Sequence, residues 1–318
     1  MCCPSKWLVV GSILSIVIGF LVMSAYLGTI NTHPTMVHGY GPHLVIMIHG
    51  VMGTPLEFMG IAHMFDESKY TVLIPSIRNS HTIGVRSSAI RVLNEFKTFM
   101  EGDSGKFPRI SAGFMIYQWK IKESMFGKIK KLSIIGNSMG GLVAKDLLYV
   151  LFQDPQVYRY TSSIKLDQFI CTVTPHYGAQ DENVILNTIR KTVATLFFSQ
   201  TGHDLFSEET RPIPEQDYYI KLFNKRISYV LSTFDTNVPY ASASMNSHLK
   251  IGDSITETKV NHMGLNWLFY TVPIHSGLPF NIGAHGNIMG SHFNNEWITS
   301  NRTEVLESMN HIVAQFNN

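Results

Sequence analysis

Ser138 is held between glycines in the segment GNSMGG. The apolar run before it, Leu132 to Ile135, predicts a buried strand, and Leu142 to Leu148 has the spacing of a buried helix. A tight strand-to-helix turn strains the backbone, and Gly136 and Gly140 remove the side chains that would collide there. The serine hydroxyl would then stand exposed beside the N–H groups of the new helix. The G-x-S-x-G pattern predicts a nucleophilic serine, whereas the alternative is a glycine-rich turn with a serine that caps the helix.

A serine hydroxyl is a poor nucleophile at neutral pH, so it needs a base, a group that orients the base, and donors for the developing oxyanion. The segment HGVMG follows an apolar run, residues 43–50, that predicts a central parallel strand. The backbone N–H of Val51 in this segment and that of Met139 after the serine are the predicted oxyanion donors. His49 is predicted to hold the shape of the loop rather than to act as the base.

Asp235 is the predicted orienting acid. It comes where the late strand SYVLSTF ends, and an acid at the carboxyl end of that strand can fix the tautomer of the base. The alternative is an aspartate that caps the turn DTN. The order Ser, Asp, His along the chain favours the catalytic interpretation, with Asp204 and Asp253 as the alternative acids.

The base is expected on a loop after the last predicted strand, WLFYTVPI, residues 267–274. His285 in FNIGAHGNIMG is the predicted base, because the glycines on either side of it let the loop turn sharply. His275, directly after the strand, is the second candidate. His262 precedes the strand, and His292 lies nearer the terminal helix.

Apolar strand-like runs alternate with helical segments along the rest of the chain, which predicts an α/β fold with a mainly parallel central sheet and helices on both faces. The segment 179–225 interrupts this alternation. Its stretch VILNTIRKTVATLFF is predicted to be helical. It is interpreted either as a cap or lid over the site or as an ordinary packed helix.

Six motif-like segments occur along the chain in this order: LVIMIHGVMGTPLEF, LSIIGNSMGGLVAK, TVTPHYGA, TGHDLF, FDTNVPYASA and AHGNI. Together they resemble the putative serine esterase family of lipase-like α/β-hydrolases, which includes fungal phospholipase-like proteins of lipid droplets. The resemblance extends from about His43 to the C-terminus. It implies an α/β-hydrolase fold and hydrolysis of carboxylic esters, with lipids as the usual substrates, and the AH of its closing motif matches His285. An N-terminal membrane span is not a general feature of the family.

Composition excludes few functions. The 318 residues carry a net charge of +2, which gives no reason to expect a nucleic-acid partner. No cofactor and no metal are predicted.

The basic stretch 119–131 is interpreted as the solvated face of a short helix, with contact to anionic lipid as the alternative. Of the three cysteines, Cys171 lies in an apolar run and predicts a buried free thiol, whereas Cys2 and Cys3 precede a long apolar segment, where they are either acylated or free.

That apolar segment, Trp7 to Ile30, contains no charged residue. Its length of about 36 Å at 1.5 Å per residue exceeds the roughly 30 Å of a bilayer core. It predicts an uncleaved signal anchor in preference to a cleaved signal peptide. Residues 1–30 are therefore assigned to a cytosolic tip and a span, 31–42 to a linker, and 43–318 to the hydrolase domain. The positive-inside bias, from Lys6 alone, places that domain in the lumen or outside the cell, where Asn301 begins a glycosylation sequon.

The expected function is that of a membrane-associated serine hydrolase, a lipase or phospholipase that forms an acyl-enzyme. Two alternatives stay open. One is an esterase or thioesterase that acts on soluble substrates. The other is an inactive hydrolase fold that serves as a membrane-tethered binding protein, which an intact set of Ser138, Asp235 and His285 argues against.

Overall fold

The computed structural model of the chain describes residues 33–102, 109–111, 114–116, 124–179, 184–206, 218–232, 235, 238–274, 288–289 and 302–317. Several sequence predictions fall outside these residues. They concern the span Trp7–Ile30, the two N-terminal cysteines, the candidate bases His275, His285 and His292, and the sequon at Asn301.

The described strands form one 10-stranded sheet, in the order β5-β4-β1-β3-β2-β6-β7-β8-β10-β9. Its central strands, from β3 through β2, β6, β7 and β8 to β10, are mutually parallel, and β1 and β9 pair antiparallel with β3 and β10. The bounds are β1 Met36–Gly39, β2 His43–Ile48, β3 Tyr70–Ile74, β4 Arg109–Ser111, β5 Phe114–Ile116, β6 Lys131–Asn137, β7 Lys165–Thr172, β8 Lys225–Leu231, β9 Thr256–His262 and β10 Leu265–Val272.

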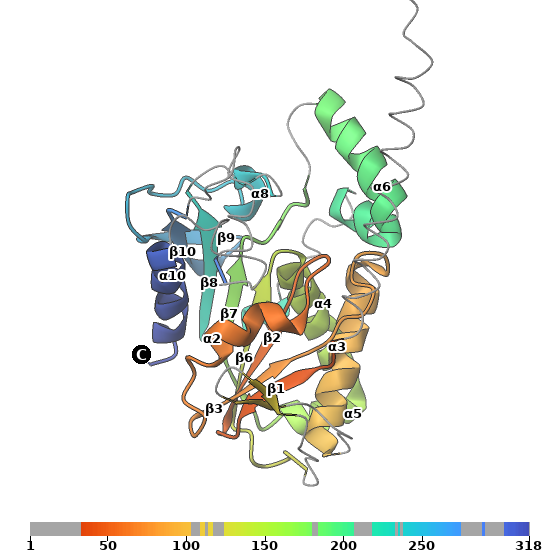
Figure 1. Cartoon of the computed structure of the whole chain (residues 1–318), viewed down its shortest axis with the longest axis vertical. Helices are drawn as coiled ribbons and strands as arrows, with labels where there is room; N and C mark the ends of the chain where they lie inside the picture. Colours follow the sequence, from red (N-terminus) through yellow and green to blue (C-terminus); the bar gives the residue numbers. More distant parts are fainter. Residues whose placement is uncertain are drawn as a thin grey trace, which may run out of the picture.

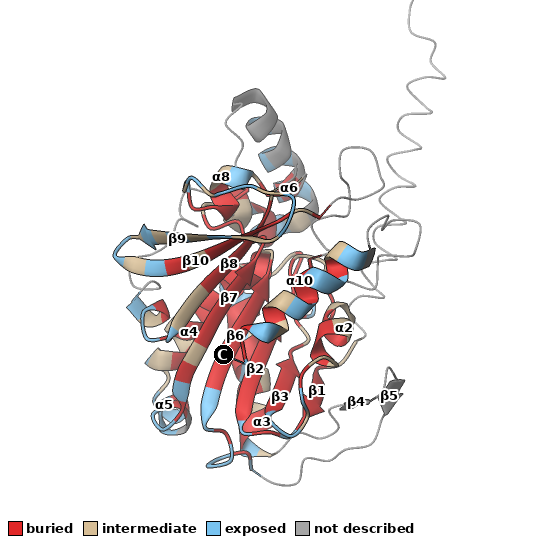
Figure 2. Cartoon of the chain, turned by 90° about the vertical axis from the view of Figure 1, so that its left-hand side faces the viewer, coloured by how far each residue is buried: buried red, intermediate tan, exposed pale blue. Residues whose placement is uncertain are grey.

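Helices cover both faces of the sheet, which confirms the predicted architecture (Figures 1 and 2). Helices α3 and α4 pack on one face, and α2 and α10 pack on the other. The helical bounds are η1 Pro55–Phe58, α2 Met59–Ala62, α3 Gly84–Glu101, α4 Met139–Gln153, α5 Pro155–Thr161, α6 Val184–Phe206, α8 Tyr240–Ala243 and α10 Arg302–Ala314.

Strand β2 shows why the central strands read as continuous apolar runs. Its side chains alternate between two hydrophobic cores, with Leu44 and Ile46 on the α3–α4 side and Val45 and Met47 on the α2–α10 side. All four are fully buried. A parallel strand covered on both faces has no solvent-facing positions, so its sequence lacks the polar alternation of an exposed sheet.

Three local predictions need correction. The sheet begins inside the predicted linker 31–42, because Met36–Gly39 forms β1. Strand β4 lies at the end of the predicted loop 101–111. In the described part of the basic stretch 119–131, residues 126–128 form a turn rather than a helix, and Ile129 is buried.

Helix α6 is kinked at Ser199, which has φ 45° and ψ −124°. The half after the kink docks on the start of α3. There the Thr201 hydroxyl accepts the Gly84 N–H at 2.9 Å, and Asp204 accepts the Val85 N–H at 2.8 Å. These two bonds satisfy N–H groups that the first turn of a helix leaves without an intrahelical partner. The motif TGHDLF therefore has a structural use here, and Asp204 is engaged as a tertiary cap.

A membrane span is not found among the helices that the structure describes: none of them combines the length and the apolar character required.

Candidate active site

The predicted elbow is present, and Ser138 occupies its tip between β6 and α4. Its backbone has φ 55° and ψ −128°, a conformation that residues other than glycine rarely adopt. Its N–H donates to the Thr172 carbonyl at 2.8 Å, which fixes the turn against β7. The Ser138 side chain makes no capping bond to α4. The strained backbone thus holds the hydroxyl away from the helix, which argues against the capping alternative.

Glycines around the elbow allow close backbone approach. A Cβ on Gly140 would lie 2.0 Å from the Ile48 carbonyl oxygen, and one on Gly136 would lie 2.5 Å from the Cα of Gly141. Both distances are impossible for real carbon atoms, so the pattern G-x-S-x-G reflects packing at the end of β2 as much as the turn itself. Beside the serine, the Asn137 side chain accepts a 2.7 Å bond from the Thr172 hydroxyl, which ties β6 to β7 at this point.

The segment HGVMG lies against the elbow, as predicted. A Cβ on Gly50 would be 2.9 Å from the Cβ of Ser138, so Gly50 packs directly against the serine. Val51 is the next residue along the chain. The Gly53 N–H closes a turn on the Gly50 carbonyl at 3.2 Å, and Met52 within it has φ 59°. Met139, fully buried, is the first residue of α4, where N–H groups lack intrahelical acceptors. The structure thus brings Ser138, Val51 and Met139 together.

His49 braces this loop from inside the core. It is 1% exposed, its Nδ1–H donates to the Gly50 carbonyl at 3.0 Å, and its Nε2 accepts the Ile77 N–H at 3.2 Å. Burial lowers the pKa of His49 to about 4, so the ring is neutral at physiological pH. Because both ring nitrogens are occupied by the backbone, His49 holds the loop and is not available as the base.

Glu57 is a second brace, which sequence reasoning missed. Its carboxylate accepts the Thr54 N–H at 3.0 Å and lies beside Gly53. The spacing T-P-L-E is a capping-box pattern and was the available signal.

Acid is expected to destabilise the folded domain, because buried imidazole rings such as that of His49 resist protonation. The pKa of His49 is about 6.5 unfolded and about 4 folded, so as pH falls through this window the unfolded state takes up a proton that the folded state excludes. The loss of stability from this one ring amounts to about 3 kcal/mol at pH 4. The full contribution of this ring to the free energy of unfolding is present above pH 6.5. His43 adds to the same slope, because burial lowers its pKa to about 4 as well.

Urea unfolding between pH 7 and pH 4 measures this effect. The slope of unfolding free energy against pH in the window should be smaller in His49→Gln than in wild type by up to one proton, about 1.4 kcal/mol per pH unit. A variant that keeps the full wild-type slope would show that His49 is not buried in the neutral form.

Asp235 lies four residues after the end of β8, which ends at Leu231. Its Oδ1 accepts the Val238 N–H at 3.2 Å, which is the turn-capping bond of the alternative interpretation. A carboxylate has further acceptor positions, so this bond leaves room for an imidazole. Strand β8 is two positions from β6 in the sheet, about 10 Å. An imidazole with a hydrogen bond on each side spans roughly 8 Å, so the placement fits an acid that reaches the serine through a histidine. The alternative Asp253 is exposed in the loop before β9.

The predicted base His285 and the candidates His275 and His292 lie outside the described residues. Two of the histidines that the structure does describe, His262 and His176, are engaged elsewhere. His262 lies on β9, and its Nε2 is 2.9 Å from the Tyr177 hydroxyl. His176 is fully buried against Trp267, and burial holds its pKa well below the usual value.

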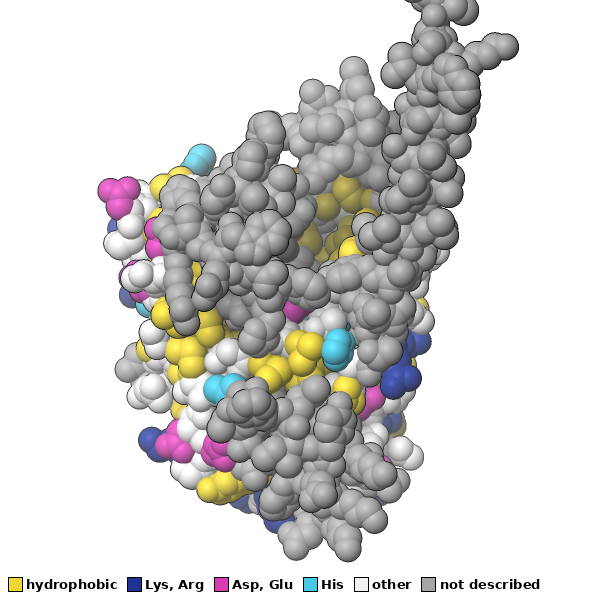
Figure 3. All heavy atoms as spheres, viewed as in Figure 1, with side chains coloured by type: hydrophobic (Ala, Val, Ile, Leu, Met, Phe, Trp, Pro, Cys, Tyr) yellow, Lys and Arg dark blue, Asp and Glu magenta, His cyan; other side chains and the backbone are white. Residues whose placement is uncertain are grey.

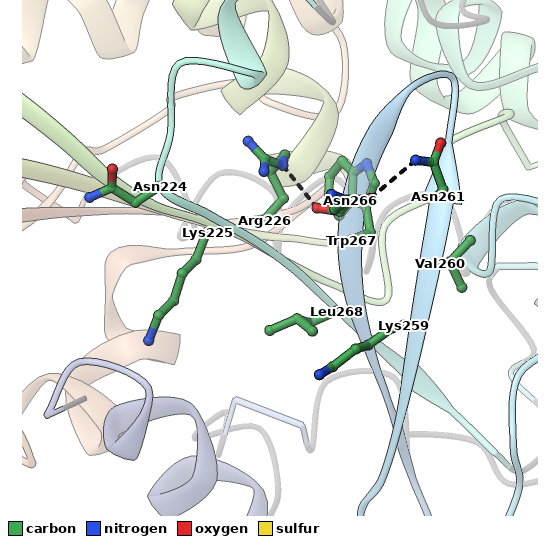
Figure 4. Close-up of a pocket in the computed structure, with 9 residues that line it drawn as sticks. All are labelled: Asn224, Lys225, Arg226, Lys259, Val260, Asn261, Asn266, Trp267 and Leu268. Atoms are coloured by element: carbon green, nitrogen blue, oxygen red, sulfur yellow. Dashed lines mark hydrogen bonds between the residues drawn. The ribbon is translucent and has the colours of Figure 1, made fainter.

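A cavity of about 630 Å³ lies elsewhere, between the start of β8 and the β9–β10 hairpin (Figure 4). Arg226 donates to the Asn266 carbonyl at 3.0 Å within it. The residues around it begin β8 and β10, whereas Ser138 follows the end of a strand parallel to both. The cavity is therefore at the opposite edge of the sheet and is not the site of the serine chemistry.

A mainly parallel sheet with a strained serine elbow after a central strand defines an α/β-hydrolase. Residues 40–249 match the family described as "Putative serine esterase", which is more than half of the chain. The chain therefore belongs to this family. The match includes Ser138 and Asp235 and ends before His285. The proposed fungal lipid-droplet subgroup gains no support from it.

The solved structures to which the chain is similar include one esterase and two lipases. A marine microorganism esterase is 17% identical (TM-score 0.31), with 51% of this chain and 49% of that chain covered. Bacillus licheniformis lipase BlEst2 is 13% identical (TM-score 0.39; 67% and 73% covered), and Aspergillus fumigatus lipase B is 16% identical (TM-score 0.39; 64% and 41% covered). The chain thus spans about half of the marine esterase. No curated protein matches the sequence.

Proposed function

We propose that this protein is a membrane-anchored serine hydrolase that cleaves lipid esters, with Ser138 as nucleophile, His285 as base and Asp235 as the acid that orients the base. The observation that carries the proposal is the elbow: a strained Ser138 whose side chain does not cap α4 and whose Cβ faces Gly50 of the loop HGVMG.

The chemistry follows from these positions. The Ser138 Oγ attacks the ester carbonyl carbon while the imidazole of His285 takes its proton, and Asp235 stabilises the resulting imidazolium. The N–H groups of Val51 and Met139 donate to the oxyanion of the tetrahedral intermediate. The imidazolium protonates the departing alcohol, which leaves an acyl-enzyme on Ser138. Water then attacks the acyl group with His285 as base again, and the acid is released.

Lipid is favoured over soluble esters by the apolar segment Trp7–Ile30 and by apolar surface on the domain. Hydrophobic side chains gather over α2 and at the level of α6 (Figure 3), and Leu196 on α6 is 76% exposed. A helix with an exposed apolar side chain near a hydrolase site suits contact with lipid. The cap or lid role of segment 179–225 remains part of this proposal.

Substrate preference tests the lipid assignment. Hydrolysis of a long-chain ester in vesicles, a water-soluble short-chain ester and a thioester of the same acyl group should be compared at equal enzyme. We expect the highest kcat/KM with the vesicle substrate. A preference for the soluble ester or thioester would favour the alternative activity, and no turnover of any of them would favour the binding protein.

The anchor is tested separately. We propose that residues 7–30 cross the bilayer once and that the hydrolase domain lies in the lumen or outside the cell. Full-length protein should stay with membranes after carbonate extraction at alkaline pH, and the domain should resist protease added from the cytosolic side. Release by carbonate would contradict the span, whereas digestion from the cytosolic side would reverse only its direction.

A further inference from the structure

The chain enters the folded domain at the same edge of the sheet as the nucleophile. Strand β1 runs antiparallel to β3 with Met36 opposite Ile74, so the start of β1 lies beside the end of β3. Strands β3, β2 and β6 are parallel, so their carboxyl ends share one edge. Ser138 directly follows β6, and β1 is three positions from β6, or about 14 Å across the sheet.

The residues before β1 are fastened to this edge. The Ser76 hydroxyl donates to the His33 carbonyl at 2.6 Å, and the Ser76 N–H donates to the Thr35 hydroxyl at 2.9 Å. The next residue, Ile77, donates its N–H to His49, whose neighbour Gly50 lies against Ser138. A continuous series of short contacts therefore joins His33 to the loop that carries the oxyanion donor.

The connection between this point and the proposed span is short. Only Asn31 and Thr32 separate Ile30 from His33. A fully extended chain advances at most about 3.6 Å per residue, so His33 lies within about 11 Å of the end of the span. The polar layer on each side of the hydrocarbon core is itself roughly 5–8 Å thick. His33 is thus confined to the outer limit of the headgroups or within a few ångströms of it.

We propose that the N-terminal span holds the catalytic edge of the sheet against the bilayer in which it is embedded, so that the enzyme hydrolyses ester lipids of its own membrane. This inference rests on the proposed anchor and esterase activity and adds the orientation and the source of substrate. Exposed apolar side chains do not decide the orientation, because Leu196 and Ile251 lie at the catalytic edge and Tyr40 and Met263 at the opposite one. The short connection between the span and His33 decides the orientation.

Lengthening the connection tests the proposal. A helical insert of four EAAAK repeats between Thr32 and His33 adds about 30 Å where it is helical. Full-length wild type and the insertion variant are reconstituted in vesicles that contain a fluorogenic long-chain ester lipid. The readout is the rate on that lipid divided by the rate of the same vesicles on a water-soluble short-chain ester. We expect this ratio to fall about tenfold or more, because the effective concentration of the site at the membrane falls.

A matched control carries the same insert after Gly127, in a turn before β6 at the opposite edge, where a Cβ would meet no atom within 4 Å. Its ratio should equal that of wild type. An unchanged ratio in the Thr32–His33 variant, or an equal fall in the control, would overturn the proposed orientation. If wild type cleaves neither ester, the proposed esterase function itself has failed, so the two failures are distinguishable.

Discussion

Replacing Ser138 with alanine is expected to lower kcat for ester hydrolysis by about 10⁴-fold or more and to leave the fold intact. The side chain occupies the tip of the elbow and makes no capping bond, so its removal costs no hydrogen bond to α4. The backbone strain at φ 55° is the same for alanine as for serine. Kinetics on a soluble ester measure the loss, and a fluorophosphonate probe, which labels activated serines, should mark wild type but not the variant.

Ser199 offers a matched control. Its backbone conformation, φ 45° and ψ −124°, nearly repeats that of Ser138, but it lies at the kink of α6 rather than between a strand and a helix. Ser199→Ala should keep labelling and turnover. Near-normal esterase activity in Ser138→Ala would refute its assignment as nucleophile, and loss of labelling in Ser199→Ala alone would place the reactive serine on α6.

Replacing His285 with alanine is expected to remove nearly as much turnover as the loss of Ser138, because the hydroxyl then lacks a base. Asp235→Ala should cost less, since the orienting acid is partly replaceable. The three side chains act as one unit, so a variant without Ser138 and His285 should be no slower than Ser138→Ala alone. Values of kcat for the single and double variants on one ester measure this coupling.

His275 is the matched control for the base. It lies three residues after the end of β10, and His285 lies ten residues further along the chain. His275→Ala should retain wild-type kcat. If His275→Ala is inactive and His285→Ala is not, the base is reassigned and the roles of Ser138 and Asp235 stand. His262→Ala should also keep turnover, because His262 ends β9 at the edge of the sheet opposite Ser138 and its ring is bonded to Tyr177.

Central strands were predictable because burial on both faces leaves an unmistakable apolar run. HLVIMI and the strand before Ser138 appear as expected in β2 and β6. Cys171 was equally predictable: it is a buried free thiol, and burial raises its pKa to about 11. Strand β9 was missed for the opposite reason. Strand β9, TETKVNH, alternates intermediate and exposed positions and is recruited by its pairing with β10.

The elbow at Ser138 was predictable from the sequence, because glycines two residues away on each side make a strained turn possible between a strand and a helix. The tertiary structure added that Gly140 also admits the Ile48 carbonyl at the end of β2. Asp235 could be placed shortly after its strand, because the strand itself is visible as an apolar run in the sequence. The use of TGHDLF could not, since Thr201 and Asp204 cap α3, more than a hundred residues earlier in the chain. The partners of His49 likewise come from the loop after β3. Only the tertiary structure decided that His33 lies at the edge that carries Ser138, because that position depends on the antiparallel pairing of β1 with β3, which no local pattern specifies.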